Sequence, residues 1–108
     1  MAKDFYVMLA PIELKDGVDE AALIAASDAF EVDFASRHKG IVRRLLLRAE
    51  HGGYADLVFF ESKADADRVA QAEAASAACM AYFKIMKTPD ESQPDMGVLG
   101  FEHVKTYQ

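Results

Sequence analysis

Two histidines lie where the proton-transfer group of an enzyme could be expected. His38 follows the first long helical pattern, and His103 lies beside Phe101 in the last apolar segment. Because the imidazole changes its charge near neutral pH, either side chain could carry a proton during catalysis. The alternative is structural, with His38 as a cation at a helix end and His103 as a hydrogen-bonded residue at a sheet edge. We predict one of the two as a catalytic proton carrier.

Arg44 is the residue best suited to hold an anion or a carbonyl oxygen. In the predicted hairpin register it shares a sheet face with Phe59 and Glu61, and Glu61 is within reach across the strands. A guanidinium in a half-apolar cleft can stabilise negative charge on a bound substrate. The alternative is a structural ion pair with Glu61. We predict Arg44 as a catalytic anchor, and Phe59 and Glu61 as substrate-binding residues.

Tyrosine hydroxyls could orient a substrate in the same cleft. Tyr54 begins a predicted strand and Tyr82 lies on a predicted helix, so we assign both to substrate binding. The alternative is a residue at the edge of the core with its hydroxyl at the surface. Cys79 lies among alanine and methionine on that helix with no cationic neighbour in sequence, which is typical of an inert buried thiol.

The sequence offers no pattern for a metal or a nucleotide cofactor. The histidines, at positions 38, 51 and 103, do not have the spacing of a shared metal site on a helix or a strand. No phosphate-binding loop, dinucleotide fingerprint or nucleophile elbow is present. We therefore expect neither a metal nor a tightly bound cofactor.

Hydrophobic periodicity gives the elements that must position these side chains. Apolar runs predict strands at residues 5–12, 41–49, 54–61 and 97–107, and helical spacing predicts helices at 18–37 and 62–87. The small residues of 73–78 predict a break or close packing within the second helix, and residues 89–95 form an acidic loop. Glycine-rich chemistry at 50–53 predicts a tight hairpin, with its turn at either 51–52 or 52–53. The order βαββαβ is that of a ferredoxin-like α+β fold, a four-stranded antiparallel sheet with both helices on one face.

Both faces of the predicted sheet are apolar at their centres. A sheet with one wetted face would alternate more cleanly between apolar and polar residues. Because a large exposed apolar patch indicates a partner surface, we expect a second copy of the chain, packed sheet to sheet about a two-fold axis.

Composition sets the limits of this interpretation. The chain has 108 residues and a formal net charge of −6, which fits one domain over residues 1–108. The acidic balance argues against a nucleic acid or an anionic membrane as the main partner. A single cysteine excludes an internal disulfide and fits the reducing cytoplasm. Residues 1–4 show no basic region followed by an apolar run, so we expect no secretion signal.

One stretch carries a family resemblance. Gly40-Ile41-Val42-Arg43-Arg44, the hairpin, and Tyr54-Ala55-Asp56-Leu57-Val58-Phe59-Phe60-Glu61-Ser62 before an alanine-rich helix resemble the dimeric α/β-barrel superfamily, which includes antibiotic-biosynthesis monooxygenases and stress-responsive barrel proteins. The resemblance implies that two protomers join their sheets into a barrel, each with a pocket between its helices and its sheet. The asparagine and tryptophan that cofactor-independent monooxygenases and haem-degrading members typically use in this pocket are both absent from the sequence.

The functional expectation combines the residues with the resemblance. We expect a small apolar or aromatic metabolite in the pocket, and a cofactor-independent enzyme that resembles a monooxygenase or an isomerase. The alternative is a non-catalytic, stress-associated or ligand-binding homodimer, in which the same polar residues form only salt bridges and rim contacts.

Overall fold

The computed structural model describes residues 5–50, 52–87 and 98–107. Its sheet contains β1 (Tyr6–Ile12), β2 (Ile41–Arg48), β3 (Tyr54–Phe60) and β4 (Leu99–Glu102) in the order β2-β3-β1-β4, and every neighbouring pair is antiparallel. This arrangement confirms the predicted ferredoxin-like fold. The acidic loop predicted at 89–95, the N-terminal residues 1–4 and His51 lie outside the described residues.

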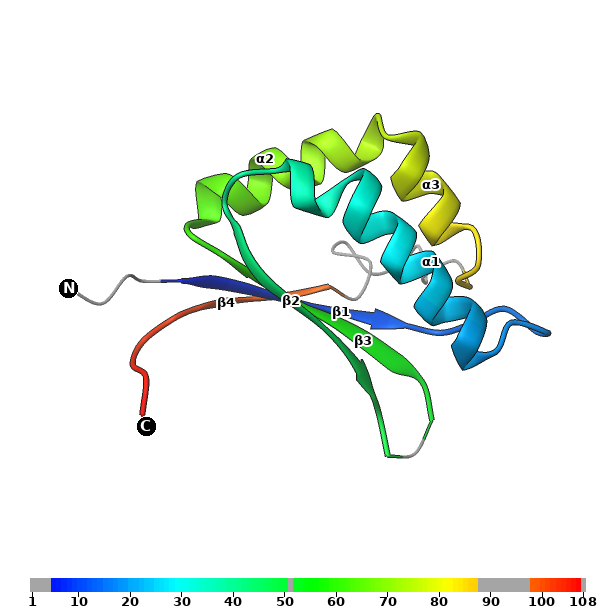
Figure 1. Ribbon diagram of the computed structural model, residues 1–108. Coiled ribbons are helices and arrows are strands. Elements are labelled where there is room, and N and C mark those ends of the chain that lie inside the picture. Colours follow the sequence, from blue (N-terminus) through cyan, green and yellow to red (C-terminus); the bar gives the residue numbers. More distant parts are fainter. Residues whose placement is uncertain (1–4, 51, 88–97, 108) are drawn as a thin grey trace.

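The helices cover one face of the sheet (Figure 1). They are α1 (Glu20–Asp33), α2 (Lys63–Ala74) and α3 (Ala77–Phe83), with a short 3-10 turn, η1 (Ala35–Arg37), after α1. The predicted break in the second helix is confirmed, because the chain leaves helical geometry at Ala75 and begins α3 with Ser76 as its N-cap. None of the helices in the described part of the chain is long and apolar enough to cross a bilayer.

The start of each long helix is set by a side-chain cap. The Asp19 carboxylate accepts a hydrogen bond from the amide of Ala22 at 2.9 Å. The Ser62 hydroxyl accepts one from the amide of Asp65 at 3.1 Å and donates to its carboxylate at 2.8 Å. Because such caps satisfy amides that have no partner inside the helix, they fix where α1 and α2 leave the sheet.

The hairpin between β2 and β3 differs from the predicted turn by one residue. The amide of Ala49 donates to the carbonyl of Gly53 at 3.0 Å, which gives a longer loop than the predicted turns at 51–52 or 52–53. Gly52 and Gly53 have φ angles of +102° and +85°, a region that glycine enters without steric cost. Since successive side chains of a strand alternate between faces, one residue of register inverts every facing pair.

This register corrects the predicted partner of Arg44. Arg44 lies opposite Val58, and Leu46 opposite Asp56. Arg44 therefore shares the helix-covered face with Asp56, and the predicted pairing with Glu61 is wrong. An irregularity between Ile41 and Arg43 returns Ile41 to the covered face as well.

The last strand is shorter than predicted. β4 ends at Glu102, although residues 97–107 read as one strand in sequence. Its partner β1 begins at Tyr6, and one further amide, that of His103, donates to the carbonyl of Phe5 at 2.8 Å. Beyond that point no strand lies alongside to continue the ladder within the described residues.

The core lies between the helices and the covered face of the sheet. Its largest fully buried side chains are Tyr82, Leu23 and Cys79. Leu23, Ser27 and Phe30 recur at helical spacing and are the buried residues of α1. Cys79 is fully buried, as the sequence predicts, and burial raises the pKa of its thiol.

Candidate functional site

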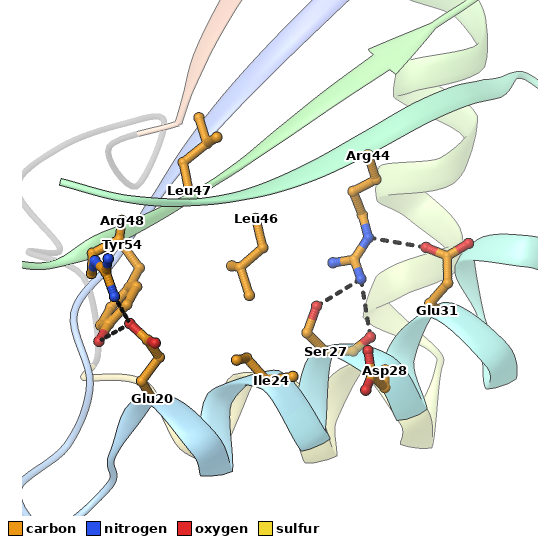
Figure 2. A pocket seen from close by; sticks show the side chains of 10 residues that line it. All are labelled: Glu20, Ile24, Ser27, Asp28, Glu31, Arg44, Leu46, Leu47, Arg48 and Tyr54. Atoms are coloured by element: carbon orange, nitrogen blue, oxygen red, sulfur yellow. Dashed lines mark hydrogen bonds and ion pairs between the residues drawn. The ribbon is translucent and has the colours of Figure 1, made fainter.

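A buried arginine lies between α1 and the sheet. The side chain of Arg44 is 9% exposed, and its Nη1 lies 3.1 Å and 3.2 Å from the two carboxylate oxygens of Asp56. Its Nη2 donates to the hydroxyl and the carbonyl of Ser27 at 2.8 Å and 3.0 Å. Its Nε donates to Glu31 at 3.1 Å. Every nitrogen of the guanidinium is therefore engaged by the protein itself. Figure 2 shows the bonds to Glu31 and Ser27.

Aromatic rings complete the surroundings of Arg44. The guanidinium carbon lies 5.0 Å from the ring centroid of Phe30 and 5.9 Å from that of Tyr82, and these two rings stack at 4.8 Å. The Tyr82 hydroxyl donates to Asp56 at 2.8 Å. Because the charge is paired, hydrogen-bonded and flanked by rings, it can remain buried.

Burial and charge change the acidity of this cluster. Burial raises the pKa of Asp56, against the opposing effects of Arg44 and of the hydrogen bond from Tyr82. Burial together with the Asp56 charge raises the pKa of Tyr82 to about 12, so its hydroxyl stays protonated and donates. The pKa of Arg44 is raised: burial, the largest single effect, lowers it, but the attraction of Asp56 together with the effects of Tyr82 and Glu31 outweighs burial.

A cavity of about 570 Å³ opens beside this cluster, between α1 and the edge of the sheet (Figure 2). Its volume is within the range of small-molecule sites. Arg44 and Ser27 form one end, and Ile24 and Leu46 provide apolar wall, whereas the side chain of Leu47 points to the other side of β2 (Figure 2). The complete lining is Glu20, Ile24, Ser27, Asp28, Glu31, Arg44, Leu46, Leu47, Arg48 and Tyr54.

A second polar group forms the other end of the cavity. Glu20 accepts hydrogen bonds from Arg48 at 2.8 Å and from the Tyr54 hydroxyl at 3.2 Å. The hydrogen bond from Arg48 is the main cause that lowers the pKa of Glu20. Arg48 is 69% exposed and Glu20 41% exposed, so this pair lies at the mouth of the cavity.

Three of the predicted site residues come together here. Arg44 and Tyr54 line the cavity, and Tyr82 contacts Arg44 from behind through Asp56. They reach the site from β2, β3 and α3, which the sheet order and the packing of α3 on α1 bring together.

The other four predicted residues lie elsewhere. His38 packs on the ring of Phe34 at 4.1 Å after η1, and His103 contacts the Phe5 ring at 5.4 Å beyond β4. Phe59 pairs with Val7 on the sheet face away from the helices, and Glu61 follows the end of β3. None of these four lines the cavity.

Several residues of the site are missing from the sequence-based prediction. Asp56 interrupts an apolar strand, and a buried carboxylate there requires a partner. Glu20, Ser27 and Glu31 recur at helical spacing on α1, with the apolar Ile24 between them, and form a mixed stripe that faces the cavity. Both signals are present in the sequence, but the wrong hairpin register directed Arg44 away from Asp56.

A further carboxyl group lies close enough to Asp56 to sense its charge. Burial, followed by repulsion from Asp56, raises the pKa of Glu73 to about 7. Among residues 5–50, 52–87 and 98–107, no side chain donates a hydrogen bond to it. Within the same residues, no group of three or more potential metal ligands gathers.

No protein-family model and no curated protein matches this chain. Several solved structures nevertheless superimpose on almost all of it. SnoaB from Streptomyces nogalater, a cofactor-independent oxygenase, is 12% identical with a TM-score of 0.60, over 99% of this chain and 97% of that one. A candidate antibiotic biosynthesis monooxygenase from Chloroflexus aurantiacus is 13% identical with a TM-score of 0.63, over 96% and 97%. NE2512 from Nitrosomonas europaea, of unknown function, is 17% identical with a TM-score of 0.64, over 98% and 95%.

The chain has the ferredoxin-like fold of the antibiotic-biosynthesis-monooxygenase-like proteins. The resemblance predicted from the sequence is confirmed at the level of the fold. At these identities the likeness carries no residue roles, because proteins that share the antibiotic-biosynthesis-monooxygenase-like fold can differ in their chemistry.

Proposed function

We propose that this protein is a homodimer that binds a small, partly apolar organic metabolite in the cavity of each protomer. The observation that carries the proposal is the cavity of about 570 Å³ between α1 and the sheet, with apolar wall beside polar groups at both ends. Pockets of this size and mixed character are typical of small-molecule sites.

The uncovered sheet face supports the homodimer. Cross-strand neighbours on this face form one row of Leu45, Leu57, Leu9 and Leu99, and a second of Arg43, Phe59, Val7 and Phe101. Leu45, Leu99 and Phe101 are 38%, 47% and 50% exposed. A continuous apolar surface of this kind favours burial against a second copy.

Catalysis on the bound metabolite is the first of two candidate uses of the site. It is supported by the shared fold with SnoaB, a cofactor-independent oxygenase. In this version Arg44 and Tyr82 position the inner end of the site and Tyr54 orients the ligand. The proton carrier is then one of the carboxyl groups that line the cavity, because neither His38 nor His103 reaches it. In this version the protein catalyses a monooxygenase-like or isomerase-like reaction on the metabolite without a bound cofactor.

A non-catalytic, stress-associated or ligand-binding homodimer is the second candidate. It is favoured by the hydrogen bonds of Arg44, whose nitrogens are all occupied by Asp56, Ser27 and Glu31. An arginine held in this way stabilises the fold and leaves no donor for an oxyanion. Turnover of a co-purified ligand under air, followed by mass spectrometry, separates the two candidates, because only the enzyme changes the mass or the isomer of its ligand.

Ligand binding is tested by filling the cavity. Native mass spectrometry of the purified protein should show a co-purified organic molecule, or reveal binding from a library of aromatic metabolites. Ile24→Trp should remove the binding, since Ile24 lines the cavity and is half-exposed. Val32→Trp is the matched control, because Val32 lies on the same helix, is 64% exposed and does not line the cavity. Equal binding by both variants would overturn the proposed site.

The homodimer is tested by light scattering after size exclusion. The protein should elute with twice its chain mass of 11.9 kDa. Leu45→Lys should shift the equilibrium to the monomer by charging the apolar row, whereas Val32→Lys on the helical side should not. A wild-type mass equal to one chain would contradict the dimer and leave the cavity proposal intact.

A further inference from the structure

The cavity presents more negative than positive charge to a ligand. Its charged lining residues are Glu20, Asp28 and Glu31 against Arg44 and Arg48. Arg44 is already paired with Asp56, which lies directly behind it, and Arg48 is paired with Glu20. Glu31 shares the Arg44 guanidinium with Asp56. One positive charge thus faces two carboxylates there, and Asp28 adds a third negative charge beside them.

The hydrogen-bonding groups of the wall show the same imbalance. The Arg44 nitrogens are occupied by the protein, and the Tyr54 hydroxyl donates to Glu20. Apart from the exposed Arg48 and the hydroxyl of Ser27, which accepts from Arg44, the side-chain donors that line the cavity are therefore already used. A ligand meets acceptors there, and it must bring its own donors to satisfy them.

Those acceptors belong to Asp28 and Glu31. Glu31 uses only Oε1 for its bond to Arg44. Asp28 forms no ion pair or hydrogen bond within the described part of the chain. The two residues are three positions apart on α1, a spacing that places side chains next to each other on a helix. Figure 2 shows Asp28 beside Ser27, at the Arg44 end of the cavity.

We propose that the metabolite is an organic amine, whose ammonium group binds Asp28 and Glu31 while its apolar body lies against Ile24 and Leu46. This inference rests on the proposed binding function and narrows it to one class of ligand. The ammonium supplies the donors that the wall lacks and offsets its charge. An anionic ligand of the same shape meets the two carboxylates at an end of the cavity where the Arg44 guanidinium is already occupied, and only the exposed Arg48 at the opposite end offers a cation.

Three probes with the same apolar body test the inference, namely naphthylmethylamine, naphthylmethanol and naphthoate, titrated into the full-length protein at neutral pH. The affinity should follow the order amine, alcohol, carboxylate. The amine should exceed the alcohol by about fivefold, the size expected for a partly exposed ion pair, and this preference should weaken at high salt. Backbone amide shifts of residues 24, 46 and 47 report in each titration whether the probe occupies the cavity.

Asp28→Asn should remove most of the preference for the amine and leave the affinity for naphthylmethanol unchanged. Asp33→Asn is the matched control, because Asp33 lies on the same helix, is exposed and does not line the cavity. Binding in the cavity with the carboxylate preferred, or with no preference, would overturn the inference and preserve the proposed function. Failure of all three probes to enter the cavity would overturn both.

Discussion

Nη1 of Arg44 lies 3.1 Å and 3.2 Å from the two carboxylate oxygens of Asp56, and the two side chains are only 9% and 10% exposed. Both come from the middle of neighbouring strands, on the face that the helices cover. The pair connects the sheet to α1 through Ser27 and to α3 through Tyr82. It therefore forms the base of the cavity and a junction between the two layers of the fold.

Removing one partner of this pair should be costly. Asp56→Ala leaves the Arg44 charge buried without its main counter-ion, and we expect a loss of about 3–5 kcal/mol in the free energy of unfolding. Urea denaturation followed by circular dichroism measures it. Lys63→Ala, which breaks the exposed Lys63–Asp67 pair, should change stability by less than about 1 kcal/mol.

Replacing both Arg44 and Asp56 by apolar residues distinguishes the contribution of their charges to stability from the contribution of their packing. The double variant Arg44→Met/Asp56→Leu should be more stable than Asp56→Ala, because no buried charge is left unpaired. A double variant as unstable as the single one would show that the pair acts mainly through its shape.

Glu73 should make the protein less stable as pH rises. Its pKa is about 7 in the folded protein against an ordinary value of 4.5, so the folded state holds this proton more tightly than the unfolded chain. Its contribution is fully present below the unfolded pKa and is lost as pH rises from about 4.5 to about 7. The difference amounts to at most about 3 kcal/mol.

Glu73→Gln should flatten this part of the stability profile and make the protein more stable than wild type above neutral pH. Thermal unfolding of both proteins across that range measures the effect. Parallel profiles for the two proteins would refute the assignment to Glu73.

Gly100 should not tolerate a side chain. A Cβ atom at this position would meet the hydroxyl of Tyr6 on the neighbouring strand. Gly100→Ala should therefore lower stability by about 1–3 kcal/mol through overpacking. Combining it with Tyr6→Phe should recover part of the loss, because the clashing oxygen is then absent. Additive losses in the double variant would exclude the contact as the cause.

Much of the fold could be predicted from the sequence because its signals are local. The caps at Asp19 and Ser62, the buried stripe of the first helix and the break before Ser76 each follow from residues within one or two turns. The short β4 could not be predicted in this way. Its end depends on where β1 begins, and apolar residues after Glu102 continue the strand pattern without a partner.

The site was predicted less well than the fold because it depends on register. The sequence indicates Arg44, Tyr54 and Tyr82 as site residues, but the predicted hairpin register places Asp56 on the opposite face from Arg44. The length of the hairpin loop decides on which face Asp56 lies, because one additional residue shifts the register. Gly52 and Gly53 are compatible with several turn types, so the sequence alone does not fix that length. The prediction of His38 and His103 rests only on the titration of imidazole near neutral pH. That property gives no information on where the fold positions the two side chains.

A crystal structure or an amide-resolved titration of the protein with naphthylmethylamine tests the central claim most directly. The account predicts the ring against Ile24 and Leu46, with its amine at Asp28. A probe bound only on the open sheet face, or no binding at concentrations that saturate comparable pockets, would contradict it.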